Sequence, residues 1–258
     1  MPLRLGDDVF LNGRISDSKC DSLMKTLKGF RYLIDAYQPV AYRACATSAM
    51  REAENGSDIA DLVRVNAGLD LEIISGDEEA AVILDNQLVK RIALGSSCLY
   101  VDVGGGSTEL TLLTVDGSLS SRSFPIGTIR LLKKRVSDDT WKEMEDWVKK
   151  RTVNQSGLVA IGSGGNINKL FSMSGRREDK PLTLEKLQDL HQRIHKLSLG
   201  QRIVQLNLRP DRADVIVPAS KIYVSVMRWG GIAKIFVPQA GLADGIVKRL
   251  YREMCPYQ

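Results

Sequence analysis

Three consecutive glycines separate two strand-like segments near the middle of the chain, in the stretch LYVDVGGGSTELTLL at residues 99–113. Glycine weakens the interior of a strand and is kept where the backbone needs a positive φ or where another group approaches closely. The apolar runs on either side predict two strands joined by a glycine turn. Backbone N–H groups in such a turn can surround an anion, so the loop is a candidate phosphate site.

A second glycine turn lies in VAIGSGGNINKLF at residues 159–171, where a predicted strand leads into a predicted helix. Its glycines are Gly162, Gly164 and Gly165. Free backbone N–H groups and the helix dipole make this helix start a candidate anion site. Either turn alone is equally well explained as a tight connection. A dinucleotide fold is disfavoured, because the first turn leads into a strand and the second lacks GxGxxG with an acidic residue about 20 positions later. The chain also has no GKS or GKT phosphate loop.

The rest of the chain alternates between helical and strand-like patterns, which predicts an α/β fold. Residues 98–124 differ, because strand, glycine turn, strand, Asp-Gly turn and strand predict an antiparallel meander. We expect Ser57 or Asp58 to cap a helix that ends at Gly68. The other predicted helices span 20–37, 77–92, 140–150, 182–197, 212–229 and 240–254, and further strands span 71–76 and 233–238.

Length and hydropathy indicate a globular protein. The chain has 258 residues, of which 43% are hydrophobic, so it can form one large domain or two ordinary ones. No apolar run approaches the roughly 18 to 20 residues that span a bilayer, and the start MPLR has no signal-peptide hydrophobic region. We therefore expect a cytoplasmic protein with no membrane partner.

Cysteine, histidine and charge narrow the chemistry. Neither a disulfide framework nor a zinc site is indicated, because only two histidines are present and the four cysteines lack CxxC pairs: Cys20, Cys45, Cys98 and Cys255. The net charge of +5 suits a polyanionic ligand, although a solvated surface with a slight lysine and arginine excess explains the charge alone better. We expect no nucleic-acid partner.

Six segments together resemble the exopolyphosphatase and guanosine pentaphosphate phosphohydrolase family, in order and in approximate spacing, over nearly the whole chain. The segments are ATSAMREAENG (46–56), EIISGDEEA (72–80), VDVGGGSTEL (101–110), SFPIGTIRL (123–131), AIGSGGNIN (160–168) and RPDRADVIVPA (209–219). The resemblance implies a branch of the actin, hexokinase and heat-shock 70 superfamily, with two ribonuclease-H-like domains and a phosphate-binding cleft between them. We expect the first domain at 1–84, with the final helix at 242–258 packing on it, and the second at 85–241.

The resemblance implies roles for the first glycine turn and the acidic residues around it. Its backbone N–H groups would surround phosphate, and the turn consists of Gly104, Gly105, Gly106 and Ser107. Asp102 and Glu109 bracket it, and two carboxylates beside a polyphosphate would repel the substrate unless a divalent cation lies between them. We therefore interpret Asp102 and Glu109 as positioning Mg²⁺ and water. A turn aspartate that caps its own loop is the structural alternative for Asp102.

The EEA motif supplies the expected general base. Acidic residues at a helix start usually compensate the helix dipole, and we expect that role for Asp77 and Glu78. The second glutamate of the motif resembles the family's water-activating base and corresponds to Glu79. Within ATSAMREA, Arg51 matches a phosphate contact of the family, which suits its bidentate guanidinium.

The hydroxyl groups of Thr47 and Ser48 stand just before Arg51 in the same motif. They could add hydrogen-bond donors to the phosphate site. They could equally cap the helix that follows, and the sequence leaves both roles open.

Two features depart from the family pattern. Members usually begin with a strand and a loop of the form AIDIGSNS, the first of two phosphate loops, whereas this chain starts with MPLRLG, which lines up with a later segment. We expect an upstream segment lost by truncation or omission, because an evolved loss of central strands would leave sheet edges unpaired. Near the end, PQAGLADGIV replaces the more usual SDRGLREGLL, which removes an arginine that could contact phosphate.

The sequence therefore favours a phosphohydrolase that releases terminal phosphate from inorganic polyphosphate or guanosine pentaphosphate by metal-assisted water attack. One alternative is an ATP-binding kinase or ATPase of the same superfamily. Another is an inactive protein that binds nucleotide or polyphosphate. The resemblance implies Mg²⁺ as cofactor and a homodimer. The sequence leaves open whether K⁺ assists and which of the two substrates is preferred.

Overall fold

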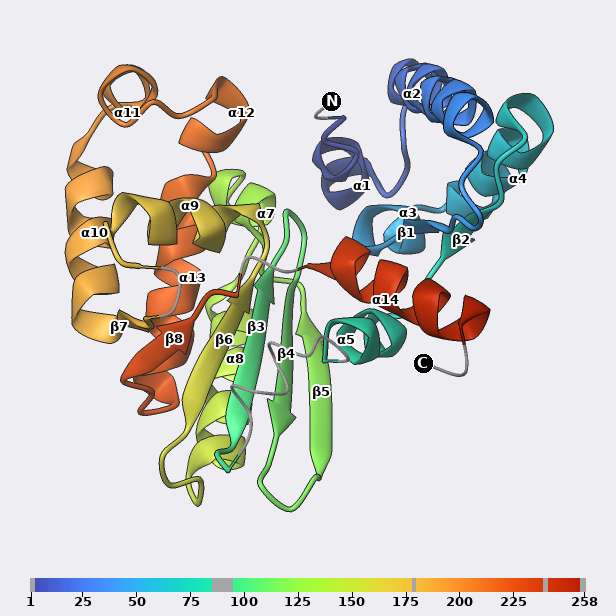
Figure 1. The fold of residues 1–258 in the computed structure, drawn as a ribbon. Helices are drawn as coiled ribbons and strands as arrows, with labels where there is room; N and C mark the ends of the chain where they lie inside the picture. The colour runs from blue at the N-terminus through green and yellow to red at the C-terminus, as the bar shows by residue number, and fades with distance from the viewer. Residues whose placement is uncertain (1–2, 85–94, 178–179, 239–240, 256–258) are drawn as a thin grey trace. The chain divides into compact units, whose positions relative to one another are not determined.

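The computed structural model describes residues 3–84, 95–177, 180–238 and 241–255 (Figure 1). The chain divides into two compact units. Unit 1 comprises Met1–Val82 and Leu242–Gln258, and unit 2 comprises Ile83–Gly241. The domain boundaries expected from the sequence, after residues 84 and 241, lie close to these divisions. Among the described residues, no helix is both long and apolar enough to cross a membrane.

Unit 1 is mainly helical, around one pair of short parallel strands. The strands β1 (Ala44–Ala46) and β2 (Leu71–Ile73) pair with Ala44 opposite Leu71. The helices are α1 (Gly6–Asn12), α2 (Asp17–Tyr37), α3 (Ser48–Glu52), α4 (Gly56–Ala67), α5 (Gly76–Leu84) and α14 (Leu242–Met254). The core of the unit includes the fully buried Ile15 and Val63.

The start of α4 differs from the sequence prediction. Its N-cap is Asn55, and the helix begins at Gly56, whereas Ser57 or Asp58 was expected as the cap. The Asn55 side chain is engaged elsewhere, because it accepts from the Ile15 N–H at 3.0 Å and donates to the Ile15 carbonyl at 2.9 Å. At Gly56 a Cβ would lie 2.0 Å from the Met50 carbonyl oxygen, so the close approach requires glycine. The predicted end at Gly68 is confirmed, with φ 62°.

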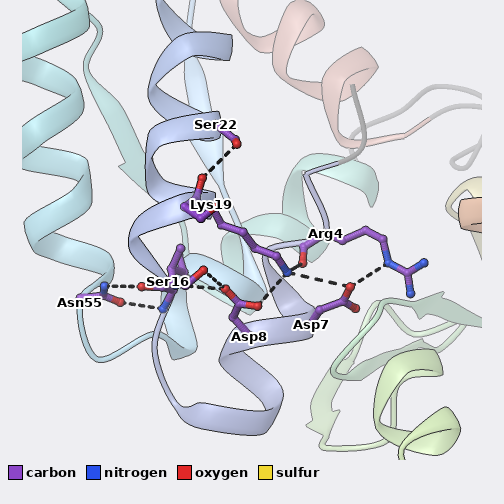
Figure 2. Close-up of polar contacts among 9 residues, drawn as sticks. Arg4, Asp7, Asp8, Ser16, Lys19, Ser22 and Asn55 are labelled. Carbon is purple, nitrogen blue, oxygen red and sulfur yellow. Dashed lines mark hydrogen bonds and ion pairs between the residues drawn. The ribbon is translucent and has the colours of Figure 1, made fainter.

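A polar network joins the first two helices of unit 1 (Figure 2). Lys19 lies 2.9 Å from Asp8 Oδ1 and donates to the Arg4 carbonyl at 2.5 Å. Asp8 also accepts from the Ser16 N–H at 3.1 Å and from its hydroxyl. Burial alone would raise the pKa of Asp8, but the bonds from Ser16 and Lys19 outweigh it and hold that pKa below its ordinary value. The network therefore fixes the chain where α1 turns into α2.

Unit 2 is built on a six-stranded mixed sheet with the strand order β5-β4-β3-β6-β8-β7 (Figure 1). The predicted antiparallel meander is confirmed, because β4 pairs antiparallel with both β3 and β5. On its other edge β3 pairs parallel with β6, which pairs parallel with β8. The strands are β3 (Cys98–Val103), β4 (Thr108–Leu113), β5 (Leu119–Phe124), β6 (Val159–Ser163), β7 (Leu182–Thr183) and β8 (Lys234–Phe236).

The helices of unit 2 pack around one almost fully buried helix. They are α7 (Thr128–Leu132), α8 (Asp138–Thr152), α9 (Gly165–Met173), α10 (Leu184–Lys196), α11 (Leu199–Gln205), α12 (Pro210–Ala213) and α13 (Ile216–Trp229). The central helix is α13, which contacts α7, α8, α9, α10 and β3. A single helix over 212–229 was predicted, but the chain forms α12 and α13 instead. Pro218 explains the division, since it has no N–H to continue the helix and fits only in a first turn.

Candidate active site

Two carboxylates face each other at the end of the β3–β4 pair in unit 2. Asp102 and Glu109 are directly opposite partners in the antiparallel register, so their side chains leave the sheet on the same face. Like charges placed opposite each other destabilise a sheet. Glu109 is held by hydroxyl groups, because its Oε1 accepts from Ser107 Oγ at 2.5 Å and from Ser123 Oγ at 3.1 Å.

The donor set of this pair fits a magnesium ion. Magnesium is usually bound by one or two protein carboxylates, with substrate phosphates and waters completing its coordination. Among the described residues there is no cluster of three or more histidine, cysteine, aspartate or glutamate side chains able to hold a metal. Asp102 and Glu109 alone would leave the remaining positions to phosphate and water, as a phosphate-transfer site needs.

The first glycine turn directs its carbonyl groups to one side. Thr128 and Ile129, at the start of α7, donate their N–H groups to the Gly104 and Gly105 carbonyls at 3.0 and 2.8 Å. Arg130 Nε donates to the Gly106 carbonyl at 2.8 Å. A helix start and an arginine thus anchor the acceptors of the loop.

The N–H groups of the same loop remain available. Gly104 donates its N–H to the Ser107 carbonyl at 3.0 Å. Within the described part of the chain, no hydrogen bond from the N–H groups of Gly105, Gly106 or Ser107 is present. Three successive N–H groups beside two carboxylates form the arrangement expected of a metal-phosphate site.

Gly127 makes this arrangement possible. A Cβ at Gly127 would lie 2.3 Å from the Gly105 carbonyl oxygen, which is far inside van der Waals contact. Only glycine allows α7 to approach the loop and donate to its carbonyls. The segment SFPIGTIRL, one of the six that resemble the family, thus contains the glycine that lets α7 pack against the first turn.

The glycines of the second turn differ in their surroundings. Gly162 lies inside β6 and is buried, and a Cβ there would lie 2.9 Å from both Ile167 and Ile235, so its missing side chain makes room for core packing. Its predicted phosphate contact stays a prediction. Gly164 is the N-cap of α9 and Gly165 is its first residue, where the first backbone N–H groups of a helix have no partner within the helix.

Asp102 lies beside both turns. Gly164 has φ 95°, in the left-handed region that favours glycine, and a Cβ there would lie 3.2 Å from Asp102 Oδ1. In the parallel register Asp102 is opposite Ser163, the last residue of β6. The two glycine turns, far apart in the sequence, therefore meet around one carboxylate.

Sequence reasoning missed Tyr223, which joins the strand ends that carry the two turns. Its buried hydroxyl donates to the Ser163 carbonyl at 2.8 Å. Burial raises its pKa well above the ordinary value, the charge of Asp102 adds to this rise, and a hydrogen bond with the Val103 backbone opposes it. Tyr223 thus links the ends of β3 and β6. The only sequence signal was a tyrosine within a mainly apolar predicted helix.

Arg212 was also missed as a site residue. Its guanidinium lies against the second turn, because a Cβ at Gly165 would lie 2.0 Å from Arg212 Nη1. A hollow of about 420 Å³ beside it is also lined by Lys169 and Arg209. The sequence signal that could have identified Arg212 was the segment RPDRADVIVPA, which contains it and is one of the six segments that resemble the family.

In unit 1 the expected base and the expected phosphate ligand lie together. Arg51 Nη1 lies 3.6 Å from Glu79 Oε2 and donates to the Ile74 carbonyl at 2.7 Å. Thr47 is the N-cap of α3 but makes no capping hydrogen bond with its side chain. Ser48 is the first residue of that helix and is half-buried. Arg51 is therefore held in place by the backbone just before α5, the helix that carries Glu79.

Glu78 pairs with an arginine of unit 1, a contact that the sequence did not predict. It lies 2.8 Å from Arg43 Nη2, and the same guanidinium binds Glu72 through Nε at 3.0 Å and Nη2 at 2.6 Å. The hydrogen bond from Arg43 lowers the pKa of Glu72. Asp77 lies in the first turn of α5 as predicted, and its side chain is outside the described residues. The two glutamates of the EEA motif therefore have different partners.

The predicted residues form one group in each unit. Unit 1 holds Thr47, Ser48, Arg51 and Glu79, and unit 2 holds the carboxylate pair and both glycine turns. Their catalytic roles stay predictions, because geometry alone assigns no reaction.

Comparison with known proteins identifies the family. Curated relatives include exopolyphosphatase 1 of Mycobacterium tuberculosis, 26% identical over 96% of this chain and 78% of that protein. A bifunctional 3-dehydroquinate synthase/phosphatase of Fusobacterium nucleatum is 26% identical over 92% of this chain and 39% of its own length.

Solved structures show the same fold. An exopolyphosphatase from Cytophaga hutchinsonii matches with TM-score 0.80 and 23% identity, covering 99% of this chain and 88% of that one. A Ppx/GppA family member from Aquifex aeolicus matches with TM-score 0.75 and 22% identity, covering 97% and 87%. The expected fold class, α/β with two ribonuclease-H-like domains, is confirmed. The Ppx/GppA phosphatase family model matches residues 1–253, so the chain belongs to this family.

Proposed function

We propose that this protein releases terminal phosphate from inorganic polyphosphate. The observation that carries the proposal is the set of unpaired N–H groups of the first turn beside the facing Asp102 and Glu109 carboxylates. Family membership and curated relatives named as exopolyphosphatases support the same reaction. Guanosine pentaphosphate ends in the same phosphoanhydride and is the second proposed substrate.

Each group has a part in the proposed reaction. Glu79 takes a proton from a water molecule, and the oxygen of that water forms a bond to the terminal phosphorus. The bond between this phosphorus and the bridging oxygen breaks, and the shortened polyphosphate leaves with the electron pair. Arg51 and the N–H groups of Gly105 and Gly106 bind the non-bridging oxygens. A magnesium ion, bound by Asp102 and Glu109, would neutralise phosphate charge.

Phosphate release tests the proposal directly. Inorganic phosphate is measured with polyphosphate, guanosine pentaphosphate and ATP as substrates, with magnesium and with EDTA. The proposal expects release from polyphosphate with magnesium and none with EDTA. Release from ATP alone would instead favour a superfamily ATPase, and binding of polyphosphate without release would favour an inactive binding protein.

Glu79→Gln sharpens this test, and Glu78→Gln is the matched control. The two glutamates are neighbours in α5, but only Glu79 lies beside Arg51, whereas Glu78 pairs with Arg43. Loss of a general base typically lowers the rate by about 10² to 10⁴-fold, so Glu79→Gln should lose phosphate release while polyphosphate affinity stays within a few-fold. Equal activity of the two variants would contradict the assignment of Glu79.

Three further points remain proposals. They are activation by K⁺, which the sequence leaves open, a homodimer, which the resemblance implies, and a cytoplasmic location, which the hydropathy of the sequence indicates. Potassium titration of phosphate release, light scattering of the purified protein and cell fractionation test them in turn. They are independent of the residue roles above.

A further inference from the structure

A second charged hollow lies in unit 2, away from the glycine turns. It has a volume of about 670 Å³ and is lined by α10, α13, α7 and α11, together with Asp214. Figure 1 shows α10 beside α13, and the two helices are in contact. The hollow contains His191 and His195, the only histidines of the chain. None of its lining residues belongs to either glycine turn or to the carboxylate pair.

Basic groups dominate the lining. Arg202, Lys221 and Arg228 add three fixed positive charges to the two imidazoles, and Asp214 is the one carboxylate in the lining. Arg202 is anchored to backbone, because its Nε donates to the Ile194 carbonyl at 3.1 Å and its Nη1 donates to the Ala213 carbonyl at 3.2 Å. The net positive charge of the hollow favours an anionic ligand.

Within the described residues, neither the Lys221 nor the Arg228 side chain forms an ion pair with a carboxylate. The Lys221 ammonium lies 5.1 Å from the ring centre of Trp141. The backbone carbonyl of Arg228 accepts from the Gly231 N–H at 3.3 Å, but no hydrogen bond from its guanidinium is present in the same described part of the chain. Both side chains are therefore available to a bound anion.

The two histidines stand one helical turn apart on α10, with ring centres 5.9 Å apart. His191 Nδ1 lies 2.8 Å from Ser220 Oγ, and that hydroxyl donates to the Val217 carbonyl at 2.9 Å. Because the hydroxyl has one proton and gives it to Val217, His191 must donate through Nδ1. In the neutral ring this leaves Nε2 without a proton, so a proton that enters with an anion binds there.

Burial lowers the pKa of His191, and the nearby charges of His195 and Lys221 lower it further. The negative charge of a bound anion acts in the opposite direction, because it stabilises the protonated imidazolium and balances the charges of His195 and Lys221.

Within the described residues, the elements around the hollow and the neighbours of α10 add no further carboxylate to its lining, whose one carboxylate is Asp214. The α7 residues that line it are Leu131 and Leu132. On α9, Lys169 lines the separate hollow beside Arg212. On α10 itself, Arg193 and Lys196 line another hollow on a different face.

A histidine pair at this spacing can also chelate a transition metal, but the surroundings disfavour a cation. Three fixed positive charges line the same hollow, and a bound metal ion would add to them. Such a site usually includes a third protein ligand, and no three-residue metal cluster is present within the described ranges. The balance of charge therefore favours an anion over a metal.

We propose that this hollow binds the diphosphate group of a small molecule, at a site distinct from the phosphate loops, with uptake of a proton by the histidine pair. Arg228 and Lys221 contact the phosphate oxygens as charged donors. The volume lies within the range of small-molecule pockets, about 300 to 1,000 Å³. Leu131, Leu132 and Val217 give one wall an apolar character that suits an organic group attached to the diphosphate.

The test is calorimetric titration of the intact protein with methylenediphosphonate, which resists hydrolysis, in EDTA. Removing magnesium weakens binding at the carboxylate pair but leaves the basic hollow unchanged. The double variant Lys221→Gln with Arg228→Gln removes two charges from the hollow. The matched control, Arg193→Gln with Lys196→Gln, removes two charges from the other face of α10. All four side chains are exposed, so both variants should fold.

Wild type and control should bind alike, and the hollow variant should bind at least about tenfold more weakly, since each charged hydrogen bond contributes appreciably. Equal weakening in both variants, or no binding by wild type in EDTA, would overturn the proposal. Binding of Zn²⁺ by wild type that methylenediphosphonate does not weaken would also overturn it.

Proton linkage gives a second measurement. Affinity should increase several-fold from pH 8 to pH 6, with proton uptake measured in buffers of different ionisation enthalpy. His191→Gln removes the ring that takes the proton at Nε2, so it should reduce this pH dependence. An unchanged pH dependence in that variant would contradict the role of the histidine pair. Comparing ADP with methylenediphosphonate separates the sources: tighter binding of ADP assigns the site to a nucleotide, and equal binding assigns it to inorganic diphosphate.

Discussion

The two glycine turns of unit 2 look alike in sequence but use glycine for different reasons. In the first turn Gly105 is not among the described glycines with positive φ, and the loop is shaped by α7, which binds its carbonyls. In the second, Gly164 needs the left-handed region at φ 95°. Gly162 does not have a positive φ, and its missing side chain leaves space for Ile167 and Ile235. Glycine is therefore required for three different reasons: close approach of α7 at Gly127, backbone conformation at Gly164 and core packing at Gly162.

Gly127→Ala should cause the largest loss of stability among changes at the turns. Its Cβ would lie 2.3 Å from the Gly105 carbonyl oxygen, so backbone must move. We expect the free energy of unfolding, measured by urea denaturation, to fall by about 3 kcal/mol. Gly117→Ala is the control, since it has positive φ but no atom within 4 Å of the added Cβ. If the control loses as much, α7 does not shape the first turn.

Gly164→Ala should lower the free energy of unfolding by less, about 2 kcal/mol, because alanine is strained at a positive φ and its Cβ would lie close to Asp102. Urea denaturation measures this loss as well. Stability equal to wild type would show that the second turn relaxes to another backbone conformation, and the contrast between the two turns would then be wrong.

Tyr223→Phe should lower the free energy of unfolding, measured by urea denaturation, by about 1 kcal/mol, because the buried Ser163 carbonyl loses its hydroxyl donor. The same change should raise the KM for polyphosphate, since Tyr223 positions both turns. A stability loss with an unchanged KM would leave Tyr223 with a structural role only.

Gly105→Val should have the smallest effect on folding and a large effect on phosphate binding. The strained backbone that was the alternative explanation for this glycine is not found, so we expect a stability loss below about 1 kcal/mol. Thermal melting with and without tripolyphosphate and magnesium checks this, and the variant should gain no stability from the ligand. A variant that melts much lower but is stabilised as wild type is would show that the loop is only a turn.

The sequence was sufficient for local structure and for the order of the motifs. The order of strand-like runs, glycine turn and Asp-Gly turn predicted the meander, and Gly68 predicted the end of α4. Phe30 shows the limit of periodicity: the spacing of Leu23 and Phe30 places both on one face of α2, but Leu23 is buried and Phe30 is 54% exposed. Periodicity finds the face of a helix, whereas burial depends on what packs against each part of that face.

The parts of the site that were missed depend on contacts between distant segments. The contact of Arg212 with Gly165 and the link from Tyr223 to Ser163 join positions 47 and 60 residues apart in the numbering. No local pattern records such contacts. Asn55 was missed as a cap for the same reason, because its side chain is bound to Ile15.

The facing carboxylates provide the most direct test of the proposed metal-phosphate site. Asp102→Asn relieves a like-charge pair and removes one metal ligand, so thermal melting is measured in EDTA and again with magnesium and tripolyphosphate. The account predicts that the variant melts at least as high as wild type in EDTA but gains much less stability from magnesium with tripolyphosphate. If the variant gains as much as wild type, Asp102 does not bind the metal, and the proposed site is misplaced.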